Sequence, residues 1–211
     1  QDAMEETISG GRRKKYLRPS INSYMYGNAM AVGNICALGG DSAKARQYFA
    51  KAASLREAVH EVLWNERHQF FETHRVDSSA NVREAIGFMP WYTGLAKDES
   101  KYSAAWLQAA DPKGFSAPYG LTTAERRHPQ FRTHGTGKCE WDGAVWPFAT
   151  SQTLTALANF ANDYTASRNL SPITSNLSPL KLDSLFYAEM EKYMQSQHMR
   201  GKPYIGEDLD E

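Results

Sequence analysis

The first 64 residues carry two long runs of apolar side chains at helical spacing, and this pattern constrains the fold more than any other feature. In the first run, residues 20–38, apolar side chains recur every three or four positions, which is the period of one helix face. A Gly-Gly pair ends the run, and Asp41 follows as the N-cap of a second run that reaches Trp64. The pattern predicts an antiparallel helical hairpin.

Helical spacing also occurs in four later segments, residues 84–95, 100–109, 147–164 and 183–199. Pro90 has to lie in the first turn of its helix or break it, and Pro147 suits a first helical turn. A short β-excursion could form around Phe70 and Phe71. The sequence therefore predicts an all-α fold of about six helices in three hairpins.

Two segments lack any helical period. Residues 111–138 are rich in Gly, Pro, Thr, Arg and His, and a loop of that length inside a compact domain is usually functional. Residues 165–182 are rich in Ser and Pro and predict a variable surface loop. Two glycosylation sequons, at Asn169 and Asn176, lie in this loop and hint at a secreted protein, but the motif also arises by chance. The localisation stays unknown.

Composition argues against several kinds of partner. Twenty-four basic and 24 acidic residues leave a net charge of zero, so no overall field steers the protein toward nucleic acid or an anionic membrane. No apolar run approaches the roughly 20 residues of a membrane helix, and the first residues lack the apolar stretch of a signal peptide. None of the six histidines has a metal-binding spacing, and Cys36 and Cys139 are interpreted as free thiols rather than a disulfide. We expect no metal, cofactor, nucleic acid or membrane.

Three tryptophans are candidates for a sugar-binding surface, because the flat indole ring stacks well on the C–H face of a sugar. Trp141 and Trp146 share a glycine-containing loop with Asp142, and Trp91 follows a proline. The alternative is that they are core aromatics, which is the interpretation favoured for Trp64.

The loop "PYGLTTAERRHPQF", residues 118–131, gathers further polar side chains. Tyr119 and Arg126 lie in it beside Glu125 and Arg127, a set that could bind hydroxyl groups or a carboxylate. A solvated loop held by salt bridges is the alternative.

Carboxylates near the two ends of the chain could carry out hydrolysis. Cleavage of a glycosidic bond needs one acid to protonate the leaving oxygen and a second carboxylate opposite it. The segments "DAMEETISG" and "YIGEDLDE" supply acidic residues outside the helical runs. Composition alone would not single them out, since most acidic residues only solvate a surface.

Six segments, taken in order, resemble the C-terminal part of the (α/α)6-barrel glycoside hydrolases related to mannosylglycerate hydrolase and glycoside hydrolase family 63. The segments are "DAMEETISG", "RPSINSYMYGNAMAV", "EAIGFMPWYTGL", "DPKGFSAPYGLTTAERRHPQF", "CEWDGAVWPFATSQTLTALANF" and "PYIGEDLDE". The resemblance spans nearly the whole chain, and the order of the segments makes it specific.

The resemblance implies an inverting glycosidase that cleaves a small glycoside or oligosaccharide. In the family the general acid follows a methionine, which implies Glu5, with Asp2 and Glu6 as rivals. The general base lies in a short acidic segment near the C-terminus, which implies Glu207. The resemblance also implies that the following residues line the sugar pocket: Tyr24, Trp91, Tyr92, Tyr119, Arg126, Trp141, Asp142 and Trp146.

Two departures from the family pattern leave the sugar open. Family members often show Trp-Asn-Gly-Pro-x-Trp, whereas this chain has Asp142 for the asparagine and Ala144 for the proline. Ala3 stands before Met4, where relatives often have glycine, which weakens the assignment of Glu5.

A complete (α/α)6 barrel has twelve helices, so the six counted here predict about half of one toroid. We therefore expect residues 1–211 to form part of a single catalytic domain. Its partners would be a carbohydrate substrate and the remainder of the same barrel. Two other classes stay open, a non-catalytic carbohydrate-binding or scaffold module, and a lyase or epimerase that uses His128 and Tyr119. Convergence of Glu5 and Glu207 on one pocket would favour the hydrolase.

Overall fold

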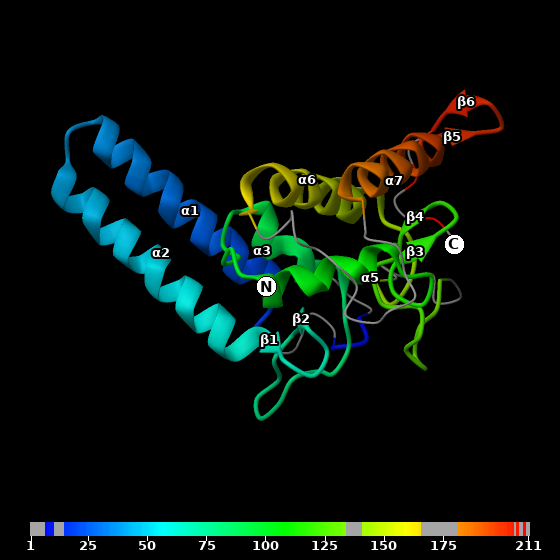
Figure 1. Cartoon of the computed structure of the whole chain (residues 1–211), viewed down its shortest axis with the longest axis horizontal. Coiled ribbons are helices and arrows are strands. Elements are labelled where there is room, and N and C mark those ends of the chain that lie inside the picture. Colours follow the sequence, from blue (N-terminus) through cyan, green and yellow to red (C-terminus); the bar gives the residue numbers. More distant parts are fainter. Residues whose placement is uncertain are drawn as a thin grey trace.

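The computed structural model describes residues 7–10, 15–133, 141–165 and 181–204, together with residues 206 and 209. Long helices dominate these ranges, which confirms the predicted all-α class: α1 (Pro19–Leu38), α2 (Ser42–Leu63), α6 (Pro147–Asp163) and α7 (Leu182–Ser196). The α1–α2 hairpin projects from one side of the molecule, and α6 and α7 lie over the rest (Figure 1).

The hairpin forms as the sequence predicts. Pro19 occupies the first turn of α1, where its missing N–H costs no helical hydrogen bond. The Asp41 side chain caps α2 by accepting the N–H of Lys44 at 3.0 Å. Between the helices Gly40 adopts a φ of 81°, a left-handed conformation that glycine reaches at little cost.

The predicted helix pair at residues 84–95 and 100–109 is split into single turns. The pieces are η1 (Ala85–Phe88), α3 (Met89–Tyr92), α4 (Ser100–Ser103), η2 (Ala104–Trp106) and α5 (Leu107–Ala110), of which η1 and η2 are 3₁₀ turns. Pro90 lies in the single turn of α3, directly after η1, so of the two predicted outcomes the structure shows the broken helix. Gly87 lets η1 approach the neighbouring strand closely, because a Cβ there would lie 2.4 Å from the carbonyl oxygen of Phe71.

Three short antiparallel hairpins complete the described fold: β1 (Trp64–Asn65) with β2 (Phe70–Phe71), β3 (Ser116–Ala117) with β4 (Gly120–Leu121), and β5 (His198–Met199) with β6 (Lys202–Pro203). The first confirms the β-excursion. The second lies inside the predicted loop 111–138. The third corrects the last helix, which ends at Ser196 rather than Met199 because the chain reverses through positive φ angles at Arg200 and Gly201.

Aromatic rings fill the core between α2, α3 and α6. The rings of Trp106 and Phe160 stack with centroids 5.6 Å apart, and the ring of Phe88 stacks on Trp106 at 4.7 Å. Trp64 lies at the edge of the same core, as expected. Offset and edge-to-face aromatic pairs of this kind each add about 0.5–1.5 kcal/mol beyond the burial of their area.

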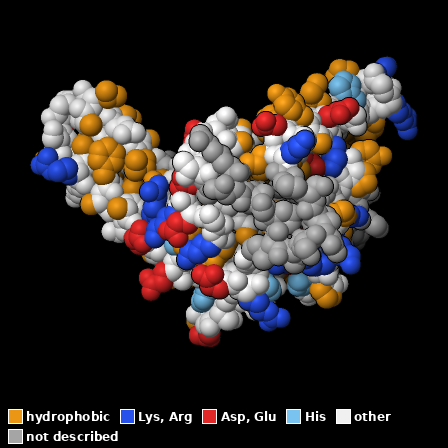
Figure 2. Space-filling model, viewed as in Figure 1, with side chains coloured by type: hydrophobic (Ala, Val, Ile, Leu, Met, Phe, Trp, Pro, Cys, Tyr) orange, Lys and Arg blue, Asp and Glu red, His pale blue; other side chains and the backbone are white. Residues whose placement is uncertain are grey.

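Helix α1 exposes apolar side chains that α2 does not cover. Met25, Ile35 and Leu38 are 57%, 67% and 90% exposed. Apolar patches are visible on the projecting hairpin in Figure 2. Cys36, also on α1, is a free thiol, and Cys139 lies outside the described residues. None of the helices described is long and apolar enough to cross a membrane.

Candidate active site

Backbone hydrogen bonds connect several distant segments directly before α6. The N–H of Ala85 donates to the carbonyl of Thr123 at 2.8 Å, and the N–H of Thr123 donates to the carbonyl of Ala144 at 3.2 Å. Val145 and Leu209 then exchange two hydrogen bonds, each of 2.9 Å. We call these residues, with Glu84 and Thr122, the backbone ladder. It brings residue 209 beside the loop that precedes Trp146.

The N-terminal end of the chain is attached to the same ladder. The backbone N–H of Ser9 donates to Oε1 of Glu84 at 3.0 Å, and both residues are buried. Glu84 in turn forms an antiparallel bridge with Ala124. Residues 9 and 209, from opposite ends of the chain, therefore attach to one structure.

Four predicted binding residues form an aromatic cluster next to the ladder: Tyr24, Tyr92, Trp141 and Trp146. The two tryptophan rings stack with centroids 4.7 Å apart, and Trp141 also packs against Ile86 and Met89 together with both tyrosines. The tyrosine rings meet edge to face at 6.4 Å. Trp141 is partly exposed, whereas Trp146 is 7% exposed. Trp141 is thus the more accessible ring of the pair, and the buried Trp146 supports it.

Asp142 is buried and ties its loop to residue 132. Its carboxylate pairs with Nε of Arg132, and its carbonyl accepts the Arg132 backbone N–H at 3.2 Å. Gly143 makes this approach possible, since a Cβ there would lie 2.2 Å from the Arg132 carbonyl oxygen. Among the described residues, Oδ1 of Asp142 has no hydrogen-bond partner. The carboxylate of Asp142 therefore anchors the loop through one oxygen, while its second oxygen remains available as an acceptor.

Tyr119 and Arg126 belong to the β3–β4 region. Tyr119 lies in the turn of the hairpin and is 54% exposed. Arg126 donates to the carbonyls of Pro112 and Ser116 at 2.7 and 3.2 Å, so its guanidinium holds the base of the hairpin. The hairpin reaches the ladder through Gly120, where a Cβ would lie 3.1 Å from Cγ1 of Val145.

Trp91 lies in the core. Its side chain has no exposed surface, and its ring packs against Phe71, Trp106 and Phe160 at centroid distances of 5.6, 5.5 and 6.2 Å. The physical reason is that the short helix α3 turns this ring inward and Tyr92 toward the aromatic cluster. A ring without exposed atoms cannot stack on a sugar.

Glu5 and Glu207, with the rivals Asp2 and Glu6, lie outside the described residues. The nearest described positions are Thr7, two residues after Glu5, and Gly206, one residue before Glu207, with Leu209 two residues after that glutamate. Of these, Leu209 bonds directly to the ladder, and Thr7 opens the turn that Ser9 attaches to it.

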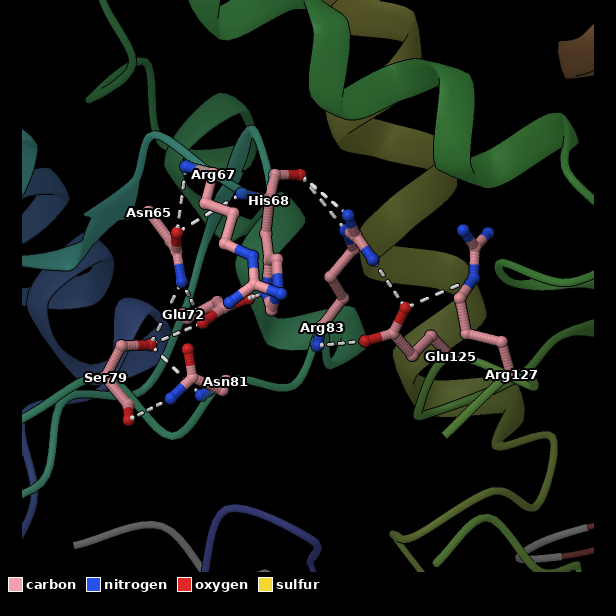
Figure 3. A network of polar contacts seen from close by, with 9 residues as sticks. All are labelled: Asn65, Arg67, His68, Glu72, Ser79, Asn81, Arg83, Glu125 and Arg127. Carbon is pink, nitrogen blue, oxygen red and sulfur yellow. Dashed lines mark hydrogen bonds and ion pairs between the residues drawn. The ribbon is translucent and has the colours of Figure 1, made fainter. Parts of the chain in front are cut away.

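Sequence reasoning missed a network of buried carboxylates (Figure 3). Glu72 accepts from Nδ2 of Asn65 at 2.9 Å and contacts Nδ1 of His68 at 2.5 Å. Glu125 accepts the backbone N–H of Arg83 at 3.0 Å and its Nη1 at 2.6 Å. Arg83 and Glu125 lie 42 residues apart, so no local pattern could reveal their pairing, whereas the partners of Glu72 lie four and seven residues from it. For Glu125 the network favours the salt-bridged loop over a sugar contact.

A pocket of about 600 Å³ lies toward the other end of α6. Arg56, Lys97, Asn159 and Asp163 contribute to its wall. A helix of 17 residues is about 25 Å long, so this pocket is distant from Trp146 at the helix start. We place the candidate site at the ladder, because the acidic segments from both chain ends attach there. Within the described ranges, no group of three or more His, Cys, Asp or Glu residues could hold a metal ion.

Comparison with solved structures reveals close and distant relatives. A protein named sialidase is 60% identical and superposes with a TM-score of 0.88 over the whole of this chain, which spans only 18% of that protein. The GH63 mannosylglycerate hydrolase from Thermus thermophilus in complex with Tris is 16% identical, with a TM-score of 0.65 over 92% of this chain and 42% of the other.

The neutral trehalase from Saccharomyces cerevisiae is 15% identical, with a TM-score of 0.56 over 69% of this chain and 28% of its own. The two distant likenesses establish the fold, that of the (α/α)6 glycosidases, of which this chain forms a part. No curated protein sequence matches the chain. The family model for the mannosylglycerate hydrolase MGH1-like glycoside hydrolase domain matches residues 2–211. The chain therefore belongs to the MGH1-like glycoside hydrolase family.

Proposed function

We propose that this chain forms part of the catalytic domain of an inverting glycosidase that cleaves a small glycoside or an oligosaccharide. The observation that carries the proposal is the attachment of Ser9 and Leu209 to one backbone ladder beside the aromatic cluster. A scaffold or binding module has no need to gather acidic segments from both chain ends beside exposed aromatic rings. Neither lyase nor epimerase chemistry gains comparable support from His128 or Tyr119.

In the proposed mechanism Glu5 protonates the leaving oxygen, while Glu207 takes a proton from a water that attacks the anomeric carbon from the opposite face. An inverting enzyme must leave room for this water, so its two carboxyl groups lie about 6.5–9.5 Å apart, against about 5–5.5 Å in a retaining enzyme. Thr7 and Leu209 each lie two residues from the proposed catalytic group. Ser9 and Leu209 both attach to the backbone ladder, which supports placing the two glutamates near one site.

The proposed sugar surface consists of Trp141, Tyr92 and Tyr24, with Trp146 supporting Trp141 from behind. An indole face stacks on a sugar ring, and the hydroxyl groups of the tyrosines offer hydrogen bonds at the edge of the cluster. Tyr119 and Arg126 are proposed as polar groups at the rim of this surface, and the buried Asp142 is proposed to support it by fixing the tryptophan loop. Trp91 is left out, because its ring has no exposed atoms.

We also propose that the remainder of the same barrel packs on α1. A helix that is apolar on several faces is normally covered on more than one of them, and α1 leaves Met25, Ile35 and Leu38 exposed. The chain spans 42% of the mannosylglycerate hydrolase of similar fold and 18% of the protein named sialidase. Further helices of the parent protein would bury this face.

A second candidate is that the parent protein acts on sialosides, which the name of the 60% identical relative favours. That name describes a protein more than five times as long as the matched part, so the activity could reside in another part of it. Sialidases use a tyrosine nucleophile rather than a carboxylate pair. The two candidates therefore differ in both substrate and catalytic group.

The test is an activity screen of the full natural protein that contains this chain. The panel would hold α- and β-mannosides, glucosides, trehalose and sialosides, with the anomeric form of the first product followed by NMR. We expect hydrolysis of a neutral glycoside, with inversion, that is lost in Glu207→Gln. Hydrolysis of sialosides alone, unaffected by this substitution, would reject the proposal in favour of the second candidate. Sugar binding without hydrolysis of any substrate in the panel would identify the chain as part of a non-catalytic carbohydrate-binding module.

A further inference from the structure

Two charged side chains hold the turn at residues 7–10 by its backbone. Glu84 accepts the N–H of Ser9 at 3.0 Å. From the other side, Arg75 donates to the carbonyls of Ser9 and Ile8 at 3.1 and 3.3 Å. A turn of four residues without regular secondary structure is thereby fixed on both its donor and its acceptor side.

A third charged residue also holds this turn. Arg18, which is 5% exposed, donates through Nη2 to the carbonyl of Gly10. Thr7 closes the turn itself, with its hydroxyl donating to the same carbonyl at 2.8 Å. Glu84, Arg75 and Arg18 together therefore hold the whole turn rather than a single peptide.

The burial of Glu84 is energetically unfavourable for a charged side chain. It is 4% exposed, and burial raises the pKa of its carboxyl group, an effect opposed by the hydrogen bonds from Ser9 and the charge of Arg18. Buried carboxylates are costly unless they are paired and hydrogen-bonded, and they add little net stability even then. What this carboxylate provides is a rigid acceptor, because its own backbone belongs to the ladder through Ala124.

The position of this acceptor matters for the proposed acid. Glu5 precedes Thr7 by two residues, a span of about 7 Å at most along the chain. A shift of the turn would therefore move the point from which the segment bearing Glu5 begins. Catalytic groups displaced by about 1 Å can cost two orders of magnitude in rate.

We infer that Glu84 is a positioning residue for the proposed general acid Glu5, acting through the buried backbone N–H of Ser9. This inference rests on the proposed function. Glu84 would touch neither substrate nor water; it would fix the turn from which the acid-bearing segment extends.

The test compares two substrates of the same sugar, a dinitrophenyl glycoside and a methyl glycoside, in the full natural protein. Only the methyl glycoside needs its leaving oxygen protonated, so loss of the acid slows this substrate selectively. Glu84→Met removes the acceptor while keeping the volume. We expect it to lower turnover of the methyl glycoside at least about tenfold more than that of the dinitrophenyl glycoside, as Glu5→Gln does.

A glutamine at this position can still accept the Ser9 N–H. In Glu84→Gln we therefore expect the ratio of the two turnover rates to lie close to that of the wild type. The matched control is Glu72→Met, which removes an equally buried carboxylate whose partners, Asn65 and His68, lie in the β1–β2 region. It should lower the melting temperature without changing the ratio of the two turnover rates. If Glu84→Met fails to fold, Ser9→Pro decides the question, because proline lacks the backbone N–H that donates to Oε1 of Glu84. We expect it to change the ratio in the same direction.

Each outcome separates this inference from the function on which it rests. Equal losses on both substrates in Glu84→Met, with a selective loss in Glu5→Gln, would overturn the role of Glu84 and leave the hydrolase intact. An unchanged ratio in Ser9→Pro, where Glu84→Met is unfolded, would do the same. If Glu5→Gln shows no selective loss on the methyl glycoside, the assignment of Glu5 as the general acid is wrong, and the inference about Glu84 is rejected with it.

Discussion

Leu209 and Val145 pair through two reciprocal backbone hydrogen bonds of 2.9 Å, which fasten the C-terminal segment to the loop that carries the tryptophan pair. Leu209 lies two residues after Glu207, and Val145 lies one residue before Trp146. The pairing is therefore the physical link between the proposed base and the proposed sugar surface.

Leu209→Pro should weaken the attachment of the C-terminal segment to the tryptophan loop. Proline has no N–H, so one of the two hydrogen bonds with Val145 is lost. We expect turnover of the full natural protein to fall by about tenfold or more, while its melting temperature changes little because the residue belongs to a single bridge. Leu209→Ala keeps both backbone bonds and should retain activity. A proline variant as active as the alanine variant would show that the pairing does not position the base.

Trp141 and Trp146 should respond differently to truncation although their rings stack on each other. Trp146 is 7% exposed, so Trp146→Ala should cost about 3–5 kcal/mol of unfolding free energy. Trp141→Ala removes a partly exposed ring and should mainly weaken sugar binding. Denaturant unfolding and calorimetric titration with the sugar identified by the activity screen separate the two effects. Loss of stability without loss of affinity in Trp141→Ala would assign both rings to the core.

Gly143→Ala should destabilise the tryptophan loop. A Cβ at this position would lie 2.2 Å from the Arg132 carbonyl oxygen, so the two backbones must separate and the bridge between them is lost. Overpacking of this kind costs about 1–3 kcal/mol. Gly39→Ala is the control, since its Cβ would meet no atom closer than 3.4 Å and its φ is −79°. Similar unfolding free energies for the two variants would contradict the predicted strain.

His60 should make the protein sensitive to mild acid. Burial lowers its pKa below the ordinary value of 6.5, an effect opposed by the hydrogen bond from Nδ1 to the carbonyl of Arg56. With Nδ1 as the donor, Nε2 is the acceptor for the backbone N–H of Lys97 at 3.1 Å, and a proton on Nε2 would break that bond.

The sign of the effect follows from the two pKa values of His60. Below pH 6.5 the unfolded chain binds a proton that the folded protein resists, so stability should fall as the pH drops from 6.5 to the lower pKa of the folded state. The slope contributed by one group is at most about 1.4 kcal/mol per pH unit. Melting curves between pH 5 and 7 should show a weaker slope in His60→Gln, whereas an unchanged slope would assign the acid sensitivity to other groups.

The sequence predicted the features that depend on local chemistry. The α1–α2 hairpin follows from helical spacing, a Gly-Gly turn and the Asp41 cap, all of which act within a few residues. Pro147 was correctly placed in a first turn for the same reason, and of the two outcomes predicted for Pro90 the structure shows the broken helix. The family resemblance was also correct, because it rested on several ordered segments rather than on one motif.

The features that depend on distant contacts could not be predicted in this way. The segment around residues 84–109 breaks into single turns, and in the first of them Gly87 packs tightly against Phe70 and Phe71, a contact that no helical period reveals. Burial of Trp91 is likewise decided by Phe71, Trp106 and Phe160 around it. The grouping of Trp141 with Tyr24 and Tyr92 came from the resemblance alone, since periodicity does not bring such positions together.

Turnover of the Glu207→Gln variant of the full natural protein tests the central claim most directly. Glutamine keeps the size of the side chain but cannot take a proton from water, so hydrolysis should be lost for methyl and dinitrophenyl glycosides alike, while sugar binding persists. Glu207→Asp keeps the carboxylate and should retain a measurable rate. Wild-type turnover in a correctly folded Glu207→Gln variant would contradict the assignment of the base and, with it, the proposed mechanism.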